Sequence, residues 1–217
     1  MKNINQLISI IVPVFNESES IGYLLDEVVN VMHTNKINFE IIVVNDGSQD
    51  STSNVLDELT IKIQELSVIS LRKNYGQTAA MSAGFDNSNG EIVITLDGDL
   101  QNDPNDIPIL ISHINEGYDL ICGWRYDRKD KLINRRIPSK IANKLIANVT
   151  GLKLHDYGCS LKAFKKEILD DIKLYGELHR FLPVLANIEG AKIKEIKVNH
   201  RTRKYGSSKY GIDRTFR

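Results

Sequence analysis

The stretch EIVITLDGDLQ, residues 91–101, joins a short apolar segment directly to two carboxylates. Its apolar part, residues 92–96, is rich in β-branched side chains, which is typical of a strand covered on both faces of a sheet. Asp97 and Asp99 follow at once, and unpaired carboxylates are too costly to bury in a core. In an open α/β sheet, ligands bind at the carboxyl ends of the strands. The stretch therefore predicts a strand that ends at a ligand site.

The pair Asp97 and Asp99 has two interpretations. Oxygen ligands this close together suit a hard divalent cation such as Mg²⁺ or Mn²⁺, which also binds phosphates. However, Asp and Gly are also common turn residues, and two acids one residue apart form a weak pattern. From these residues alone, a metal site and a simple turn remain equally open.

Strand-like and helix-like patterns alternate along the first 123 residues. Such alternation predicts an α/β fold with a doubly wound, mostly parallel sheet of the Rossmann-like kind. Asn16 and Glu19 have the spacing of a capping-box variant at the first helix. Small residues in the third helix predict close packing against the sheet. The predicted strands are 7–15, 39–44, 68–71, 92–96 and 118–123, and the predicted helices are 21–32, one opening at Ser51 or Thr52, 77–85 and 104–116.

Polar clusters follow three of these strands, at residues 16–17, 46–48 and 97–99. Strand ends that converge on one crevice are the arrangement that binds nucleotides. The glycine-rich dinucleotide fingerprint is missing after the first strand, which argues against a dehydrogenase, and the phosphate-cradling Walker loop is also missing. The sequence therefore predicts a nucleotide crevice of another class.

The two parts of the chain differ sharply in charge, although the net charge is zero. Residues 1–124 hold 5 Lys and Arg against 18 Asp and Glu, whereas residues 125–217 hold 23 against 10. Such asymmetry indicates that the second part meets something anionic, such as nucleic acid, a phosphorylated ligand or a membrane surface. The alternative is that the basic and acidic parts simply pack together.

The second part predicts further elements and a basic segment. Residues 125–144 hold 8 Lys and Arg against 2 Asp and Glu, and a helix at 137–152 follows the densest charge. It is either a basic amphipathic helix lying on a membrane or a helix packed on the core behind a solvated loop. The remaining predictions are a strand at 160–164, helices at 165–173 and 178–189, a strand at 193–198 and a basic tail from residue 200.

Cys122 and Cys159 lie far apart and form no C-x-x-C pair, so a reducing cytosol is the default expectation. The N-terminus reaches a strand pattern within a few residues, without the charged and apolar regions of a signal peptide. No apolar run approaches the length that spans a bilayer. These features predict a cytoplasmic protein.

Short motifs run in order through essentially the whole chain. They are VPVFNE (12–17), NDGSQDST (45–52), RKNYGQTAAMSAG (72–84), LDGDLQNDP (96–104), GWR (123–125), RRIPSKIAN (135–143), HDYGCSLKAF (155–164), HRF (179–181) and HRTRKYGSSKY (200–210). Each motif alone is weak, but together they resemble family 2 glycosyltransferases of the GT-A fold, and most of all the dolichol-phosphate-mannose-synthase-like branch of polyprenyl-phosphate sugar transferases. Gly98 stands where relatives often carry Ala, and Trp124 replaces a frequent Ser.

The resemblance implies a set of site residues. Asp97, Asp99 and Gln101 would hold a divalent metal and the donor diphosphate. Asp156 would lie beside the reacting groups, so that the catalytic set is Asp99, Asp156 and Arg125. Pro13, Phe15, Glu17 and Asp46 would line the base and ribose pocket, Arg125, Arg135 and Ser139 would take the acceptor phosphate, and Arg203 and Lys209 would close over the diphosphate.

The resemblance also implies a domain division. Residues 1–199 would form the catalytic domain, with a nucleotide-sugar-binding half at 1–123 and an acceptor-binding half at 124–199. Residues 200–217 would form a basic arm, expected to be mobile without ligand and to close as a lid. Many relatives continue into transmembrane helices after this point, so the chain is either a trimmed form or a member without them.

The expected reaction is inverting, metal-dependent transfer of one hexose from a UDP- or GDP-sugar to a polyprenyl phosphate. The protein would act as a peripheral enzyme on an anionic membrane, at its cytoplasmic face, without a nucleic-acid partner. One alternative is a family 2 transferase that acts on a sugar or glycan hydroxyl. Another is a nucleotide-binding module without catalysis. Sugar, base, prenyl length and oligomeric state stay open.

Overall fold

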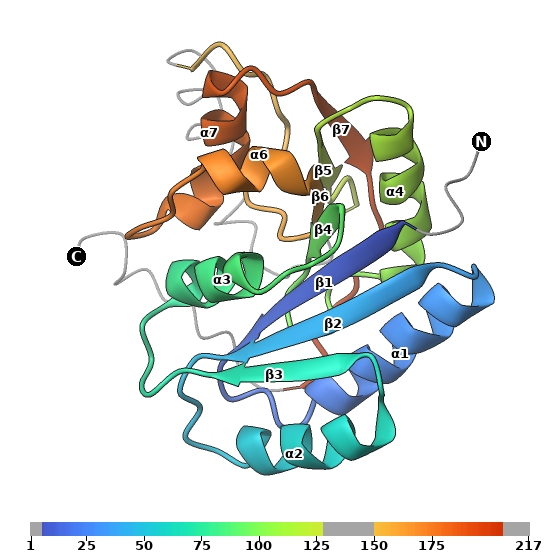
Figure 1. Cartoon of the computed structure of the whole chain (residues 1–217), viewed down its shortest axis with the longest axis vertical. Coiled ribbons are helices and arrows are strands. Elements are labelled where there is room, and N and C mark those ends of the chain that lie inside the picture. The colour runs from blue at the N-terminus through green and yellow to red at the C-terminus, as the bar shows by residue number, and fades with distance from the viewer. Residues whose placement is uncertain (1–5, 128–149, 206–217) are drawn as a thin grey trace.

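The computed structural model describes residues 6–127 and 150–205. These residues form one seven-stranded sheet in the order β3-β2-β1-β4-β6-β5-β7, with helices on both faces (Figure 1). The strands are β1 (Leu7–Val14), β2 (Asn38–Asn45), β3 (Leu66–Ser70), β4 (Ile92–Thr95), β5 (Leu120–Trp124), β6 (Lys162–Lys165) and β7 (Ile193–Lys197). The helices are α1 (Ile21–Thr34), α2 (Thr52–Lys62), α3 (Gln77–Asp86), α4 (Ile107–Asn115), α6 (Lys166–Asp171) and α7 (Leu182–Ile188), with 3-10 turns η1 (Pro104–Asp106) and η2 (Leu178–Phe181).

The sheet is mostly parallel, and this confirms the predicted α/β fold. β1 pairs in parallel with β2 and β4, β2 with β3, and β5 with β7. β6 is the exception, because it lies antiparallel between β4 and β5. Strands from both parts of the chain therefore share one sheet, and the carboxyl ends of β1, β2 and β4 meet at one edge.

Side chains alternate between the two faces of the central strands, as the strand period requires. In β1, Ile10 and Val12 face a core that includes residues of α1, α2 and α4. Ile11 lies between them and faces the other core, which α3, α6 and α7 cover. Burial of apolar side chains on both faces explains why these strands are continuous apolar runs rather than alternating ones.

The close packing predicted for the third helix is present. α3 lies directly against β1, and a Cβ atom on Gly84 would collide with the Ile11 side chain. A larger residue at position 84 would require the Ile11 side chain to shift. This contact brings the N-terminus of α3 to the carboxyl end of the sheet.

Several predicted boundaries are wrong. Asn16 does not cap the first helix, because its backbone is left-handed (φ 54°) and its side-chain oxygen accepts from Gln49 N–H at 2.7 Å. α1 begins at Ile21. Pro104 opens a 3-10 turn rather than α4, and the predicted helix at 178–189 is divided into η2 and α7. Of the predicted helix at 137–152, residues 137–149 lie outside the described part of the chain.

Two further sequence features have a structural counterpart. Cys122 and Cys159 are both buried free thiols, and no disulfide joins them. Within residues 6–127 and 150–205, no helix has the length and apolar character needed to cross a bilayer.

Candidate functional site

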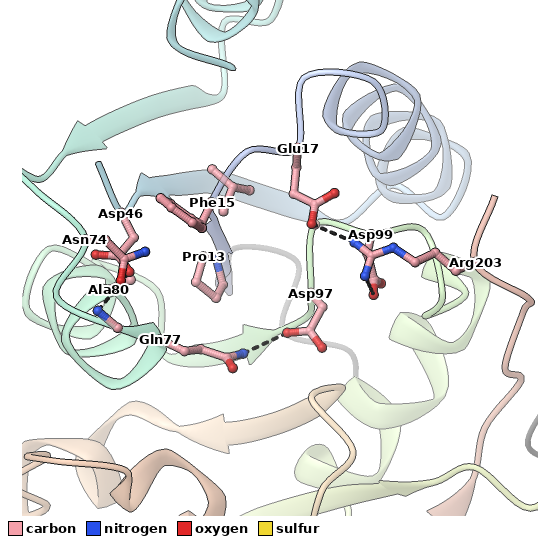
Figure 2. Close-up of a pocket in the computed structure, with 13 residues that line it drawn as sticks. Pro13, Phe15, Glu17, Asp46, Asn74, Gln77, Ala80, Asp97, Asp99 and Arg203 are labelled. Carbon is pink, nitrogen blue, oxygen red and sulfur yellow. Dashed lines mark hydrogen bonds and ion pairs between the residues drawn. The ribbon is translucent and has the colours of Figure 1, made fainter. Parts of the chain in front are cut away.

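A cleft opens at the carboxyl ends of β1, β2 and β4, where the polar clusters were predicted to converge (Figure 2). Its walls come from the loops after these strands, from the N-terminus of α3 and from one residue near the C-terminus. The lining residues are Pro13, Val14, Phe15, Glu17, Asp46, Asn74, Gly76, Gln77, Ala80, Asp97, Gly98, Asp99 and Arg203.

The acid pair lies at the centre of this cleft. Asp97 accepts a hydrogen bond from the Gln77 side chain at 2.8 Å, while Arg203 Nη1 lies 3.6 Å from Asp99 Oδ2. Burial and then the negative charge of Asp97 raise the pKa of Asp99 to about 6, although the Gln101 N–H and Arg203 partly oppose the shift. A buried carboxylate whose pKa is raised by a second carboxylate is unfavourable to the fold, which makes the acid pair a candidate cation site.

The loop that carries the pair is strained and firmly held. Leu100 adopts a left-handed backbone (φ 62°), a conformation that branched and bulky residues rarely accept, while its side chain is buried in the core. Asn102 fixes the loop, because its side-chain oxygen accepts from Asp97 N–H at 3.2 Å and from the Ser160 hydroxyl at 2.8 Å. The orientation of the carboxylates is therefore set before any ligand arrives.

The glycine between the two acids also has a structural reason. A Cβ atom on Gly98 would lie 2.7 Å from Val14 Cγ1, and the Gly98 carbonyl accepts from the Ser20 hydroxyl at 2.9 Å. Alanine, which the resemblance implies is common at this position, would require Val14 to move. Glycine at position 98 therefore leaves room for the Val14 side chain at the end of β1.

Asp46 closes the opposite side of the cleft. Its buried carboxylate accepts from the backbone N–H groups of Tyr75 at 2.7 Å and Gly76 at 2.9 Å. Gly47 has φ 65° and lies so close to the Lys73 backbone that a Cβ atom would collide with it. Asp46 thus ties the loop before α3 to the end of β2 and shapes the pocket in which a base could lie.

Residues 199–205, which we call the strap, follow β7 and reach the cleft at Arg203. Alternate residues face carboxylates: Asn199 bonds Asp106 (2.7 Å), Arg201 bonds Glu27 (2.6 Å) and Asp103 (2.8 Å), and Arg203 bonds Glu17 (2.7 Å). The Tyr205 ring stacks on Tyr23 with centroids 5.5 Å apart. In the strap, part of the positive charge of residues 125–217 is therefore paired with carboxylates of the same chain.

The expected mobility of the arm without ligand stays a prediction. Residues 200–205 lie against the fold, where Arg201 pairs with Glu27 and Asp103, and Arg203 pairs with Glu17 in the cleft. Lys209 lies outside the described residues.

Arg125 and Asp156 form a second charged unit. Arg125 Nε and Nη2 donate to the two Asp156 oxygens at 2.7 and 2.9 Å, and each side chain is only 14% exposed. Burial alone would raise the pKa of Asp156, but the hydrogen bonds and charge of Arg125 outweigh burial and lower it. Burial alone would lower the pKa of Arg125, yet Asp156, with a smaller contribution from Asp97, raises it. The pair is therefore ionised at neutral pH.

The predicted site residues fall into three groups. Those that line the cleft are Pro13, Phe15, Glu17, Asp46, Asp97, Asp99 and Arg203. Arg125, Asp156 and Gln101 do not line it, and the Gln101 amide instead donates to the Arg201 carbonyl at 3.4 Å. Arg135, Ser139 and Lys209 lie outside the described residues.

Sequence reasoning missed Asn74 and Gln77 as lining residues, although both lie in a motif that was noticed. Gln77 is the first residue of α3 and bonds Asp97 directly. The signal for it was available: a polar side chain that opens a helix next to the sheet edge.

The acid pair fits a hard divalent cation such as Mg²⁺ or Mn²⁺, because its donors are carboxylate oxygens on a rigid loop. No cluster of three or more His, Cys, Asp or Glu side chains suited to a metal occurs in the described ranges. Magnesium in particular is commonly held by one or two carboxylates, with the remaining positions taken by water and substrate phosphates.

A buried histidine lies beneath the cleft. His179 in η2 shares a 2.6 Å hydrogen bond with the Thr78 hydroxyl in α3, one residue from Gln77. Burial, followed by the positive charges of Arg180 and Lys162, lowers the pKa of His179 from 6.5 to about 4. The ring is therefore neutral at pH 7 and supports the start of α3.

This shift predicts a pH dependence of stability. Since the pKa is lower in the fold than in the unfolded chain, the stability contributed by neutral His179 is present above pH 6.5 and lost as pH falls towards 4. The loss is roughly 3 kcal/mol, at about 1.4 kcal/mol per pKa unit. His179→Asn keeps a partner for Thr78 without titrating. Denaturant unfolding between pH 7 and 4 should show a smaller decline for the variant, and parallel curves would contradict the prediction.

Comparisons with known proteins agree with this geometry. The family described as Glycosyl transferase family 2 matches residues 9–173. Dodecaprenyl-phosphate galacturonate synthase of Rhizobium johnstonii is 47% identical over 214 residues, which are 97% of this chain and 63% of that protein. Undecaprenyl-phosphate 4-deoxy-4-formamido-L-arabinose transferase of Proteus mirabilis is 40% identical over 206 residues, 94% of this chain and 63% of that protein. The chain thus spans less than two thirds of these relatives.

A solved structure shows the same fold. Glucosyl-3-phosphoglycerate synthase from Mycobacterium tuberculosis, in complex with uridine diphosphate, has a TM-score of 0.72 over 97% of this chain and 75% of its own, at 18% identity. The sheet order and the match over residues 9–173 agree with the resemblance drawn from the motifs. The chain belongs to glycosyl transferase family 2.

Proposed function

We propose that this chain transfers one sugar, of the hexose type, from a UDP- or GDP-sugar to a polyprenyl phosphate with inversion at the anomeric carbon. The observation that carries the proposal is the Asp97–Asp99 acid pair at the centre of the cleft, with Arg203 Nη1 3.6 Å from Asp99 Oδ2. A metal-binding acid pair suits a donor diphosphate, and the buried guanidinium of Arg125, outside the cleft lining, suits an acceptor phosphate. The polyprenyl phosphates in the names of both similar transferases support the acceptor class.

Each part of the site has a role in this proposal. Pro13, Phe15 and Asp46 would line the pocket for the base and ribose, and Asp97 and Asp99 would hold Mg²⁺ or Mn²⁺. The bound metal would offset the charge that develops on the departing diphosphate. Gln101 supports Asp99 through its backbone N–H at 3.1 Å. Arg125 faces the acceptor phosphate, assisted by Arg135 and Ser139 from the segment outside the described residues.

Arg203 is expected to change partners when the donor binds. With its guanidinium on Glu17 and Asp99, the cavity measures about 130 Å³, whereas ligand pockets are usually about 300–1,000 Å³. A diphosphate would attract the guanidinium away from the acids by charge-assisted bonds. The strap and Lys209 would then close over the donor and exclude water from the anomeric carbon.

The state of Asp156 supports a phosphate acceptor. A sugar-hydroxyl acceptor requires a general base, whose pKa is best placed near the working pH. The pKa of Asp156 is instead lowered, and both of its oxygens are bonded to Arg125. A phosphate monoester, with a second pKa of about 6, is mostly a dianion at pH 7 and needs no base. The geometry thus favours a phosphate over the hydroxyl alternative.

The deciding experiment compares two lipid acceptors that differ by one group. Purified protein is incubated with labelled UDP- and GDP-sugars, Mg²⁺ or Mn²⁺, and either a polyprenyl phosphate or the matching polyprenol. We expect lipid-linked sugar with the phosphate alone, and none in EDTA. A product formed equally well on the polyprenol, or on a soluble glycan but not on the lipid phosphate, would contradict the proposal.

A further inference from the structure

A buried carboxylate outside the cleft holds the loop that carries Asp156. Glu195 lies in β7, and its side chain is 10% exposed. Its two oxygens accept from the His155 N–H at 2.8 and 3.0 Å, and one of them also accepts from the Asp156 N–H at 2.9 Å. The His155 ring adds a 2.6 Å bond through Nδ1. One carboxylate thus fixes two successive backbone amides at the start of the loop.

A buried cation holds the other end of the same loop. Lys162 lies in β6 and is 4% exposed. Its ammonium group donates to the Cys159 carbonyl and, at 3.4 Å, to the Tyr157 carbonyl. Burying an ammonium group is costly unless its hydrogen bonds are satisfied, and here backbone oxygens satisfy them. Loop 155–159 is therefore held by two charged side chains. Glu195 accepts from its backbone N–H groups, and Lys162 donates to its backbone carbonyl groups.

Loop 155–159 contacts the end of β5 in two places. Asp156 forms its two-point ion pair with Arg125, and the ring of His155 stacks on that of Trp124 with centroids 4.1 Å apart and planes 14° apart. The parallel pairing of β5 with β7 places Trp124 and Glu195 on adjacent strands. A displacement of the loop would therefore displace Arg125 with it.

We propose that Glu195 and Lys162 are positioning residues, which hold loop 155–159 so that Asp156 keeps the Arg125 guanidinium aimed at the acceptor phosphate. This inference rests on the proposed function, since it assigns Arg125 to the acceptor. Neither residue touches the cleft that would hold the donor. Loss of either group should consequently weaken use of the acceptor while use of the donor is preserved.

The test measures the KM values for donor and acceptor in variants that each remove one of the two charged side chains holding the loop. Glu195→Gln and Lys162→Met keep the size of each side chain and remove its charge. We expect the KM for polyprenyl phosphate to rise roughly ten- to a hundredfold, the range seen when a group that orients a functional residue is lost. The KM for the nucleotide-sugar should change less than about twofold. Glu189→Gln and Lys173→Met, at exposed positions, are the matched controls.

A second measurement distinguishes failure of the positioning role from failure of the proposed function. Hydrogen exchange at the His155 and Asp156 amides should accelerate in Glu195→Gln, whatever the enzyme transfers. If the unsubstituted protein fails to glycosylate polyprenyl phosphate, the proposed function fails. If it is active and the variant shows fast exchange with an unchanged acceptor KM, or equal losses for both substrates, the positioning role is overturned. Should Lys162→Met not fold, Glu195→Gln decides alone.

Discussion

Asp99→Asn is expected to lower the rate of sugar transfer by about a thousandfold or more while making the metal-free protein more stable. A metal at the acid pair would supply several kcal/mol of charge stabilisation, and each 1.4 kcal/mol corresponds to about a factor of ten in rate. The same carboxylate is unfavourable to the folded state, because burial and Asp97 raise its pKa to about 6. Asparagine keeps the shape and removes the charge.

The direction of the stability effect depends on pH. A carboxyl group whose pKa is raised in the fold contributes stability below its unfolded pKa and loses that contribution as pH rises through the folded value, here from 3.8 to about 6. In EDTA, Asp99→Asn should therefore melt at a higher temperature than the unsubstituted protein at pH 7.5, and the gap should narrow towards pH 4. Transfer within tenfold of the unsubstituted rate, or a lower melting temperature at pH 7.5, would argue against a metal-binding acid pair.

Much of the fold could be predicted because two signals depend only on residues close together in the sequence. These signals are the spacing of apolar residues and the polar residues that follow each strand. The runs that became β1, β2 and β4 are buried on both faces, and a run of this kind reads as a strand without any knowledge of its neighbours. The acidic residues that follow these strands lie close together because the carboxyl ends of parallel strands lie at the same edge of the sheet. Helix starts were less accessible: Asn16 has the residue type of a cap, but it accepts from Gln49 across a loop instead.

The parts that could not be predicted depend on contacts between distant residues. Nothing local indicates that β6 runs antiparallel, or that Glu195 bonds amides 40 and 39 positions earlier. The strap is the clearest case. Arg203 was expected to meet a donor diphosphate, and nothing local indicates that Arg201 reaches Glu27, 174 positions away. Whether a basic segment is ordered thus depends on where the fold places the acids.

Arg125→Met and Asp156→Leu are each expected to destabilise the protein by about 3–5 kcal/mol, because each leaves a buried charge without its partner. The double variant should recover most of that loss, since buried ion pairs can often be replaced by apolar side chains at little cost. Urea unfolding of the four proteins gives the comparison. The pair Lys165–Asp119, separated by 2.6 Å and more exposed, with side chains 32% and 21% exposed, is the matched control, and Lys165→Met should cost no more than about 1 kcal/mol.

The double variant separates structure from function at this pair. If Arg125 contacts the acceptor phosphate, transfer to polyprenyl phosphate stays lost in Arg125→Met/Asp156→Leu, even where stability has returned, because no guanidinium remains to bind the anion. Donor binding should persist, since neither residue lines the cleft. If the pair served folding alone, activity would return together with stability. A stable double variant that still glycosylates the lipid phosphate would remove Arg125 from the acceptor site.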